Sequence, residues 1–164
     1  MKLKGTRMYH FPKLFLPLAV LAFAACSLSA DEPNKSVEST ESADKQLIVV
    51  HLSHFTDDLH RCFMALKTAN MLAGEQAEVT LYLDLEGVRL AERRQELGVT
   101  WGTSDKTLGV IYEEFTAKGG KAKLCPHCAE GAQLGPISLR RFAQIATEDE
   151  LRAMWLGASK VIDY

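Results

Sequence analysis

Two cysteines three residues apart, in the stretch Cys125-Pro126-His127-Cys128, are the residues of this chain best suited to chemistry. Thiols at this spacing can form a small redox ring, relay sulfur between them, or bind one metal ion. The thiolate is the reactive form of cysteine, so its surroundings decide among these uses. The compartment of the protein and the elements around the motif therefore carry the rest of the functional interpretation.

Residues 1–25 predict an export signal. Basic residues without any acid precede an uncharged apolar run that ends in small residues and is too short for a membrane span. Phe23-Ala24-Ala25-Cys26 resembles a bacterial lipobox, in which Cys26 is lipidated, although leucine usually stands where Phe23 is. Leu28-Ser29-Ala30 could instead serve an ordinary signal peptidase. We favour the lipoprotein, held at a membrane only through its lipid anchor.

We therefore expect an exported, periplasmic protein, anchored through Cys26, or otherwise a secreted soluble one. Either compartment is oxidising. Residues 26–45 are polar and acidic without apolar periodicity, which predicts a flexible linker. From Cys26 onward, 15 basic residues stand against 21 acidic ones, a net charge of −6, so nucleic acid is not an expected partner.

Residues 46–164 predict one α/β domain of 119 residues, enough for a single core. The aliphatic run 46–52 is typical of a strand covered on both faces. Helical spacing follows from Asp57 or Asp58 to Gly74, and residues 78–84 read as a second strand.

Further elements continue this alternation of strand and helix. They are expected as a partly exposed helix over 88–97, an amphipathic helix over 108–115, a third strand over 122–125, a short strand over 142–146, a helix from 148 through 155 with a capping box at its start, and a last strand over 160–163. The pattern predicts a three-layer, Rossmann-like open sheet, mainly parallel, of about five strands. The order of the strands stays open at this point.

This architecture places Cys125 beyond the carboxyl end of a strand, with Pro126 in the first turn of the next helix. Backbone N–H groups and the helix dipole there favour the thiolate, and a protonated His127 would add to the effect. We therefore expect Cys125 to be the nucleophile and Cys128, one turn later, the resolving thiol. His54, in the loop after the first strand, is a candidate proton donor or ligand.

The layout resembles the DsrE/DsrF-like family of small Rossmann-like proteins, which are linked to sulfur relay and sometimes described as peroxiredoxin-like. The resemblance rests on the apolar first strand, Gly119-Gly120 followed by the strand ending in Cys125-Pro126-His127-Cys128, and the segment from Gly157 to Asp163. It implies that Cys125 accepts persulfide sulfur from a thiol or sulfur donor, either a protein or a small molecule. Family relatives often form oligomers, so a homo-oligomer is also an expectation.

Two other interpretations of the cysteine pair remain open. Cys125 and Cys128 could bind zinc or copper together with a nearby histidine, His54 or His127, in a module without catalysis. The pair could also form a structural disulfide. Cys62 adds little to a metal site, because it lies on the apolar stripe of its helix and is expected to be a buried, unreactive thiol.

No organic cofactor is expected. The turn after the first strand, residues 53–57, contains no glycine, so neither a dinucleotide fingerprint nor a phosphate-binding P-loop is present there. Zinc or copper in the alternative above is the one cofactor left open. The sequence thus predicts thiol redox or sulfur-handling chemistry through the cysteine pair.

Overall fold

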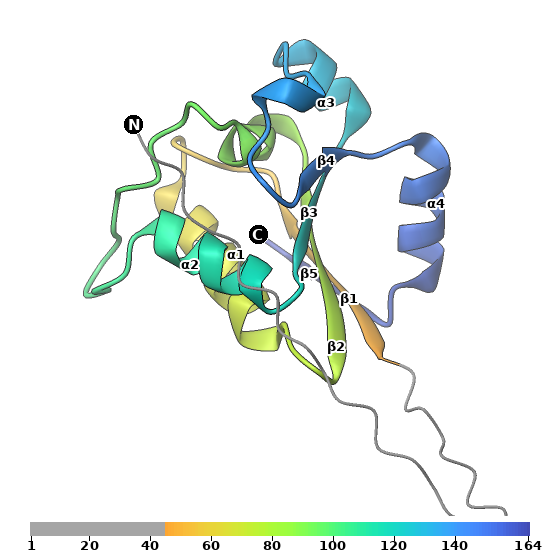
Figure 1. Ribbon diagram of the computed structural model, residues 1–164, viewed down its shortest axis with the longest axis horizontal. Coiled ribbons are helices and arrows are strands. Elements are labelled where there is room, and N and C mark those ends of the chain that lie inside the picture. Colours follow the sequence, from red (N-terminus) through yellow and green to blue (C-terminus); the bar gives the residue numbers. More distant parts are fainter. Residues whose placement is uncertain (1–44) are drawn as a thin grey trace, which may run out of the picture. The chain divides into compact units, whose positions relative to one another are not determined.

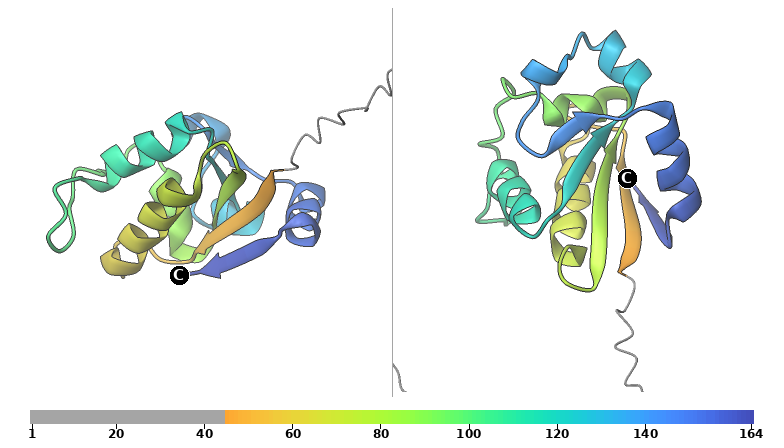
Figure 2. Two further views of the ribbon diagram at one scale, coloured as in Figure 1. Left: turned by 90° about the horizontal axis from the view of Figure 1, so that it is seen from below. Right: turned by 45° about the vertical axis from the view of Figure 1, so that its right-hand side comes forward.

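Five strands of the computed structural model pair into one parallel sheet. The structure describes residues 45–164, and the predictions for the leader, Cys26 and most of the linker concern residues outside that range. The strands are β1 (Gln46–Leu52), β2 (Ala77–Leu83), β3 (Lys121–Leu124), β4 (Ala143–Ile145) and β5 (Lys160–Asp163). Their order is β4-β3-β2-β1-β5, with β4 and β5 at the edges (Figure 2). The predicted class, an α/β Rossmann-like open sheet, is confirmed.

The helices make two further layers. They are α1 (Leu59–Leu72), η1 (Leu85–Ala91), α2 (Leu108–Ala117), α3 (Pro126–Gly131), η2 (Pro136–Ser138) and α4 (Glu148–Gly157). Helices α1 and α2 lie on one face of the sheet and α4 on the other, whereas α3 lies beyond the carboxyl end of β3 (Figure 1). Among residues 45–164, no helix is long and apolar enough to cross a membrane.

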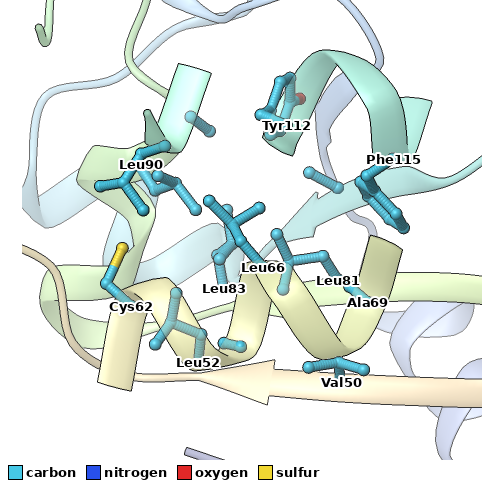
Figure 3. Close-up of a cluster of buried hydrophobic side chains, with 14 of the residues drawn as sticks. Val50, Leu52, Cys62, Leu66, Ala69, Leu81, Leu83, Leu90, Tyr112 and Phe115 are labelled. Carbon is cyan, nitrogen blue, oxygen red and sulfur yellow. The ribbon is translucent and has the colours of Figure 1, made fainter. Parts of the chain in front are cut away.

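The core lies between the sheet and the α1–α2 layer. Val50 and Leu52 of β1, Leu81 and Leu83 of β2 and Leu66 of α1 are fully buried in one cluster (Figure 3). Each such side chain contributes about 1.5–3 kcal/mol through removal from water. Successive side chains of a strand point to opposite faces of the sheet, so the residues next to these in β1 and β2 point to the α4 face.

The α4 face is more polar and less covered. No residue of α4 is fully buried, although the predicted capping box at its start is present. The Thr147 hydroxyl accepts a hydrogen bond from the Glu150 N–H at 3.2 Å, and the Glu150 carboxylate accepts one from the Thr147 N–H at 2.8 Å. Polar strand residues on this face therefore stay available for a site.

The prediction of a helix over residues 88–97 was wrong. The chain forms the short 3₁₀ helix η1 and then runs as a loop towards α2. Glu92 is extended, with ψ of 122°, and bridges Leu139, while the Arg93 N–H donates to the Ser138 carbonyl at 2.8 Å. Contacts to a distant segment thus replace the hydrogen bonds that a longer helix would make.

Candidate functional site

Cys125 lies where the sequence predicts it, directly after β3 and at the start of α3. It is the N-cap residue of that helix, and Pro126 occupies the first helical turn. The Cys125 N–H donates to the Leu83 carbonyl of β2 at 2.8 Å, so the neighbouring strand fixes the backbone of the cysteine. The motif therefore begins at the carboxyl end of an internal strand, where a hydrogen bond to β2 holds its backbone.

Cys125 and Cys128 lie 3.5 Å apart. Both are free thiols and both are half-buried. One helical turn separates them, which turns the two side chains towards the same side of α3. The pair is close enough to exchange a proton or, on oxidation, to form a disulfide.

The surroundings of Cys125 favour its thiolate. Partial burial acts to raise the pKa of Cys125, but hydrogen bonds from the Cys128 N–H, the Cys128 thiol, the Tyr82 hydroxyl and the His127 N–H outweigh it. The pKa of Cys125 therefore lies below that of an ordinary cysteine. Donors to a charged sulfur stabilise that form, which is the form that attacks.

Cys128 is shifted in the opposite direction. Burial raises the pKa of Cys128, the Leu85 N–H lowers it in part, and the neighbouring Cys125 and Asp84 raise it again. The net result is a thiol that keeps its proton more firmly than usual. The two cysteines are thus unequal, because Cys125 gives up its proton more readily than Cys128 does.

Leu85, whose N–H donates to Cys128, has an unusual backbone conformation. Its φ is +42°, in the left-handed region that non-glycine residues seldom adopt, and its side chain is 65% exposed.

A hollow of about 220 Å³ opens beside Cys128, lined by Leu85, Glu86, Arg89, Gly131 and Ala132. A reactant therefore has room next to the pair.

Tyr82, two residues before Asp84, connects the thiols to the α4 face. Burial and the adjacent Cys125 raise the pKa of Tyr82, so its hydroxyl stays protonated and donates to the sulfur. In register across the sheet, Tyr82 pairs with His51 of β1, with ring centroids 5.3 Å apart. Trp155 of α4 meets the Tyr82 ring edge-on at 5.0 Å.

His51 lies between two carboxylates. Its Nδ1 is 2.5 Å from Asp163 Oδ1, and its Nε2 is 3.0 Å from Asp84 Oδ1. The Ser53 hydroxyl is a further partner of Nε2 at 3.2 Å. His51 is therefore hydrogen-bonded and half-buried, and it forms a polar row across the sheet with Tyr82, the residue that donates to Cys125.

His54 pairs with Asp57 in the structure. His54 Nδ1 is 2.5 Å from Asp57 Oδ2, and the other oxygen of Asp57 accepts the Phe55 N–H at 2.7 Å. No hydrogen bond or ion pair joins His54 to Cys125 or Cys128 within residues 45–164. Its role as proton donor stays a prediction.

His127 approaches Cys125 through its backbone. Its side chain is 81% exposed, and the nearest carboxylate is Glu148, with Nε2 4.0 Å from Oε1. The hydrogen bond that favours the Cys125 thiolate comes from the His127 N–H. An electrostatic contribution from the imidazole stays a prediction.

Cys62 of α1 is fully buried in the core, as predicted (Figure 3). Burial raises the pKa of Cys62 to about 12, and the charges of Asp57 and Asp58 act in the same direction.

His60 points away from Cys62, and its ring stacks on Trp101 at a centroid distance of 3.7 Å. In the part of the chain that the structure describes, no three His, Cys, Asp or Glu side chains cluster as a metal site.

Tyr82 is the residue that the sequence analysis missed most clearly. Its alternation with Leu81 and Leu83 places it on the opposite face from the core, and it lies near the strand end where a site was expected. That signal is visible in the sequence. The contact with Cys125, however, depends on β2 and β3 being neighbours, which the sequence did not establish.

The parallel sheet with helices on both faces is an α/β Rossmann-like fold of the DsrE-like type. No family model and no curated protein matches the sequence. Among solved structures, the chain is similar to the E. coli YchN protein, with a TM-score of 0.58 and 22% identity over 73% of this chain and 99% of that one. It is also similar to MTH1491 of Methanobacterium thermoautotrophicum, a protein of unknown function, with a TM-score of 0.57 and 15% identity over 73% and 100%.

Proposed function

We propose that this DsrE-like domain carries out thiol exchange or sulfur transfer, with Cys125 as the nucleophile and Cys128 as the resolving thiol. The observation that carries the proposal is the pair itself: two thiols 3.5 Å apart whose pKa values are shifted in opposite directions. A structural cysteine pair has no need of this asymmetry. An attacking and a resolving thiol do.

The disulfide reaction proceeds in two balanced steps. The Cys125 thiolate attacks one sulfur of a disulfide, a mixed disulfide forms, and the second thiol leaves as a thiolate. Cys128 then loses its proton and attacks Cys125, which releases the remaining thiol and closes the Cys125–Cys128 disulfide. The substrate gains the two electrons that the cysteine pair loses.

The same geometry supports sulfur transfer. The Cys125 thiolate attacks the outer sulfur of a persulfide, a persulfide forms on Cys125, and the donor leaves as a thiolate. Attack of Cys128 on the Cys125 sulfur would then expel hydrosulfide and close the disulfide. Both reactions use a thiol or sulfur donor, protein or small molecule, as the partner and require no bound cofactor.

The compartment forms part of the proposal. Export through residues 1–25, with a lipid at Cys26 and a linker over 26–45, would place the domain at the periplasmic face of a membrane. A thiol pair in an oxidising compartment meets disulfides as its usual reactants.

Single-cysteine variants test the proposal. In a Cys26→Ser, Cys62→Ala background, we expect Cys128→Ser to accumulate a mixed disulfide with glutathione disulfide or a persulfide with a persulfide donor, resolved by mass. Cys125→Ser should react much more slowly, because it lacks the activated thiol. Equal inertness of both variants, or thiols protected by stoichiometric zinc or copper, would favour the structural or the metal-binding alternative instead.

A further inference from the structure

Arginine is concentrated on one side of this molecule. Five of the seven arginines within residues 45–164 line three adjoining hollows, although the chain carries more acidic than basic residues. We call this surface the arginine groove, and its arginines are Arg89, Arg93, Arg94, Arg140 and Arg141. The two others, Arg61 and Arg152, lie elsewhere and pair with Asp58 and Asp149.

The arginine groove begins at the thiol pair. Its first hollow, of about 220 Å³, includes Cys128. The second, of about 350 Å³, shares Arg89 and Ala132 with the first, and the third, of about 550 Å³, shares Arg93 with the second. The surface is therefore a row of recesses that leads from Cys128 along η1 to the segment before β4.

Two of the arginines hold the fold. Arg140 donates from Nε to the Leu90 carbonyl at 2.8 Å and from Nη2 to the Gln95 carbonyl at 2.5 Å. Arg89 Nη1 reaches the Ala132 carbonyl at 3.3 Å and Glu92 at 3.5 Å. These contacts fix the walls of the groove and leave only part of each guanidinium for a ligand.

The other three guanidinium groups are available. Within the described residues, no hydrogen bond or ion pair engages the side chains of Arg93, Arg94 or Arg141, and all three residues are exposed. Arg141 lies over the Phe142 ring at 5.1 Å. Three carboxylates also line the groove, Glu86, Glu92 and Glu113, so the five arginines leave it with positive charge in excess.

We propose that the arginine groove docks an acidic peptide segment of a protein partner and so presents that partner's disulfide or persulfide to Cys125. This inference rests on the proposed function. The first hollow, beside Cys128, has room for a cysteine side chain. The two further hollows, of about 350 and 550 Å³, add a volume that a small thiol would leave unfilled and that an extended chain can occupy. Carboxylates on that chain match the free guanidinium groups, and the exposed Ile137 and Phe142 offer apolar contacts between them.

The test measures binding without thiol chemistry. The full chain with all four cysteines replaced, Cys62 by alanine and the others by serine, is titrated into a dansyl-labelled peptide of alternating Glu and Ser, and fluorescence anisotropy gives the Kd. We expect binding that weakens with salt, and about a tenfold weaker Kd for the Arg93→Gln, Arg94→Gln, Arg141→Gln triple variant. The Arg61→Gln, Arg152→Gln variant is the matched control and should bind like the parent.

Three results would overturn the proposal: equal binding of a Lys-Ser peptide, equal weakening by the control variant, or binding of phosphatidylglycerol vesicles in place of the peptide. The thiol assay separates this failure from that of the proposed function. This assay uses protein that keeps Cys125 and Cys128, with and without the Arg93→Gln, Arg94→Gln, Arg141→Gln substitutions. Exchange with the small neutral disulfide of mercaptoethanol should be the same in both. Peptide binding without thiol reactivity would refute the proposed function alone, and thiol reactivity without peptide binding would refute the docking role alone.

Discussion

At the scale of single residues, the site depends on how one proton is shared between two thiols. Cys125 receives donors from the start of α3 and from Tyr82, and Cys128 lies beside the negative charge of Asp84. These contacts lower the pKa of Cys125 and raise the pKa of Cys128, so Cys125 is the thiol of the pair that ionises more readily. Backbone N–H groups at the start of α3 thus act in the direction that the sequence analysis expected, and the Tyr82 hydroxyl is a further donor that it did not identify.

Tyr82→Phe tests this account of Cys125. Iodoacetamide alkylation follows the thiolate fraction, so its rate falls as the pH drops below the pKa of Cys125, and that midpoint should lie below about 8.5, the value of a free cysteine. Loss of the Tyr82 hydroxyl removes a donor to the thiolate, and the midpoint should move to higher pH. Tyr112→Phe is the matched control, because the Tyr112 hydroxyl donates to the Arg141 carbonyl at 3.0 Å, away from the thiols. An unchanged profile in Tyr82→Phe would refute the role of this hydroxyl.

Cys62 provides an internal standard for reactivity. Because it is fully buried and its pKa is raised to about 12, it should resist alkylation in the folded protein and react only on unfolding. Mass analysis of the native protein after brief alkylation should therefore find the modification on Cys125 and none on Cys62. Early labelling of Cys62 would contradict its placement in the core.

At the scale of elements, η1 is the segment that completes the site. It follows β2, carries Leu85 towards Cys128 and returns to the end of β1, where the Gly87 N–H donates to the Ser53 carbonyl at 3.1 Å. A side chain at Gly87 would place its Cβ 2.2 Å from the Leu52 carbonyl oxygen. Only glycine allows this approach of two backbone segments.

Gly87→Ala should lower the free energy of unfolding by about 1–3 kcal/mol, because backbone atoms must move to relieve the contact. It should also slow resolution by Cys128, since η1 supplies the Leu85 N–H. Gly98→Ala is the control: nothing lies within 4 Å of a Cβ there, and its stability should change by less than about 0.5 kcal/mol. Urea unfolding measures the free energy of unfolding of both variants. Equal losses in Gly87→Ala and Gly98→Ala would contradict the importance of the close approach between Gly87 and the Leu52 carbonyl.

The elements also show what the sequence could and could not predict. The apolar run of β1, the spacing of α1 and the capping box of α4 are local patterns, and all three elements formed where expected. The helix expected over 88–97 ends at Ala91 in the structure, because Glu92 and Arg93 pair with a distant loop at Leu139 and Ser138. Local periodicity cannot report such contacts.

At the scale of the molecule, the strand order decides the composition of the site. The order β3-β2-β1-β5 lines up Lys123, Tyr82, His51 and Asp163 across one face. Cys125 lies two residues after Lys123, beyond the carboxyl end of β3. These residues are far apart in the sequence, and no spacing rule connects them. The cysteine motif could be found from the sequence, whereas its polar neighbours required the sheet.

Attachment to a membrane is a prediction about the whole chain. In a bacterial host, the mature protein should carry a lipid on Cys26 and partition into the detergent phase, and Cys26→Ser should abolish both. Mass analysis of the N-terminus makes the measurement. A mature chain that begins after Ala30 without lipid would contradict the lipoprotein and support ordinary signal cleavage.

The most direct test of the central claim is the reduction potential of the Cys125–Cys128 pair in the Cys26→Ser, Cys62→Ala protein. Equilibration with glutathione buffers, followed by alkylation and mass analysis, gives the fraction oxidised. We predict a reversible couple between about −120 and −230 mV, the range of exchange-active pairs. A bridge that resists reduction below about −300 mV would contradict thiol exchange and leave the pair as a structural disulfide.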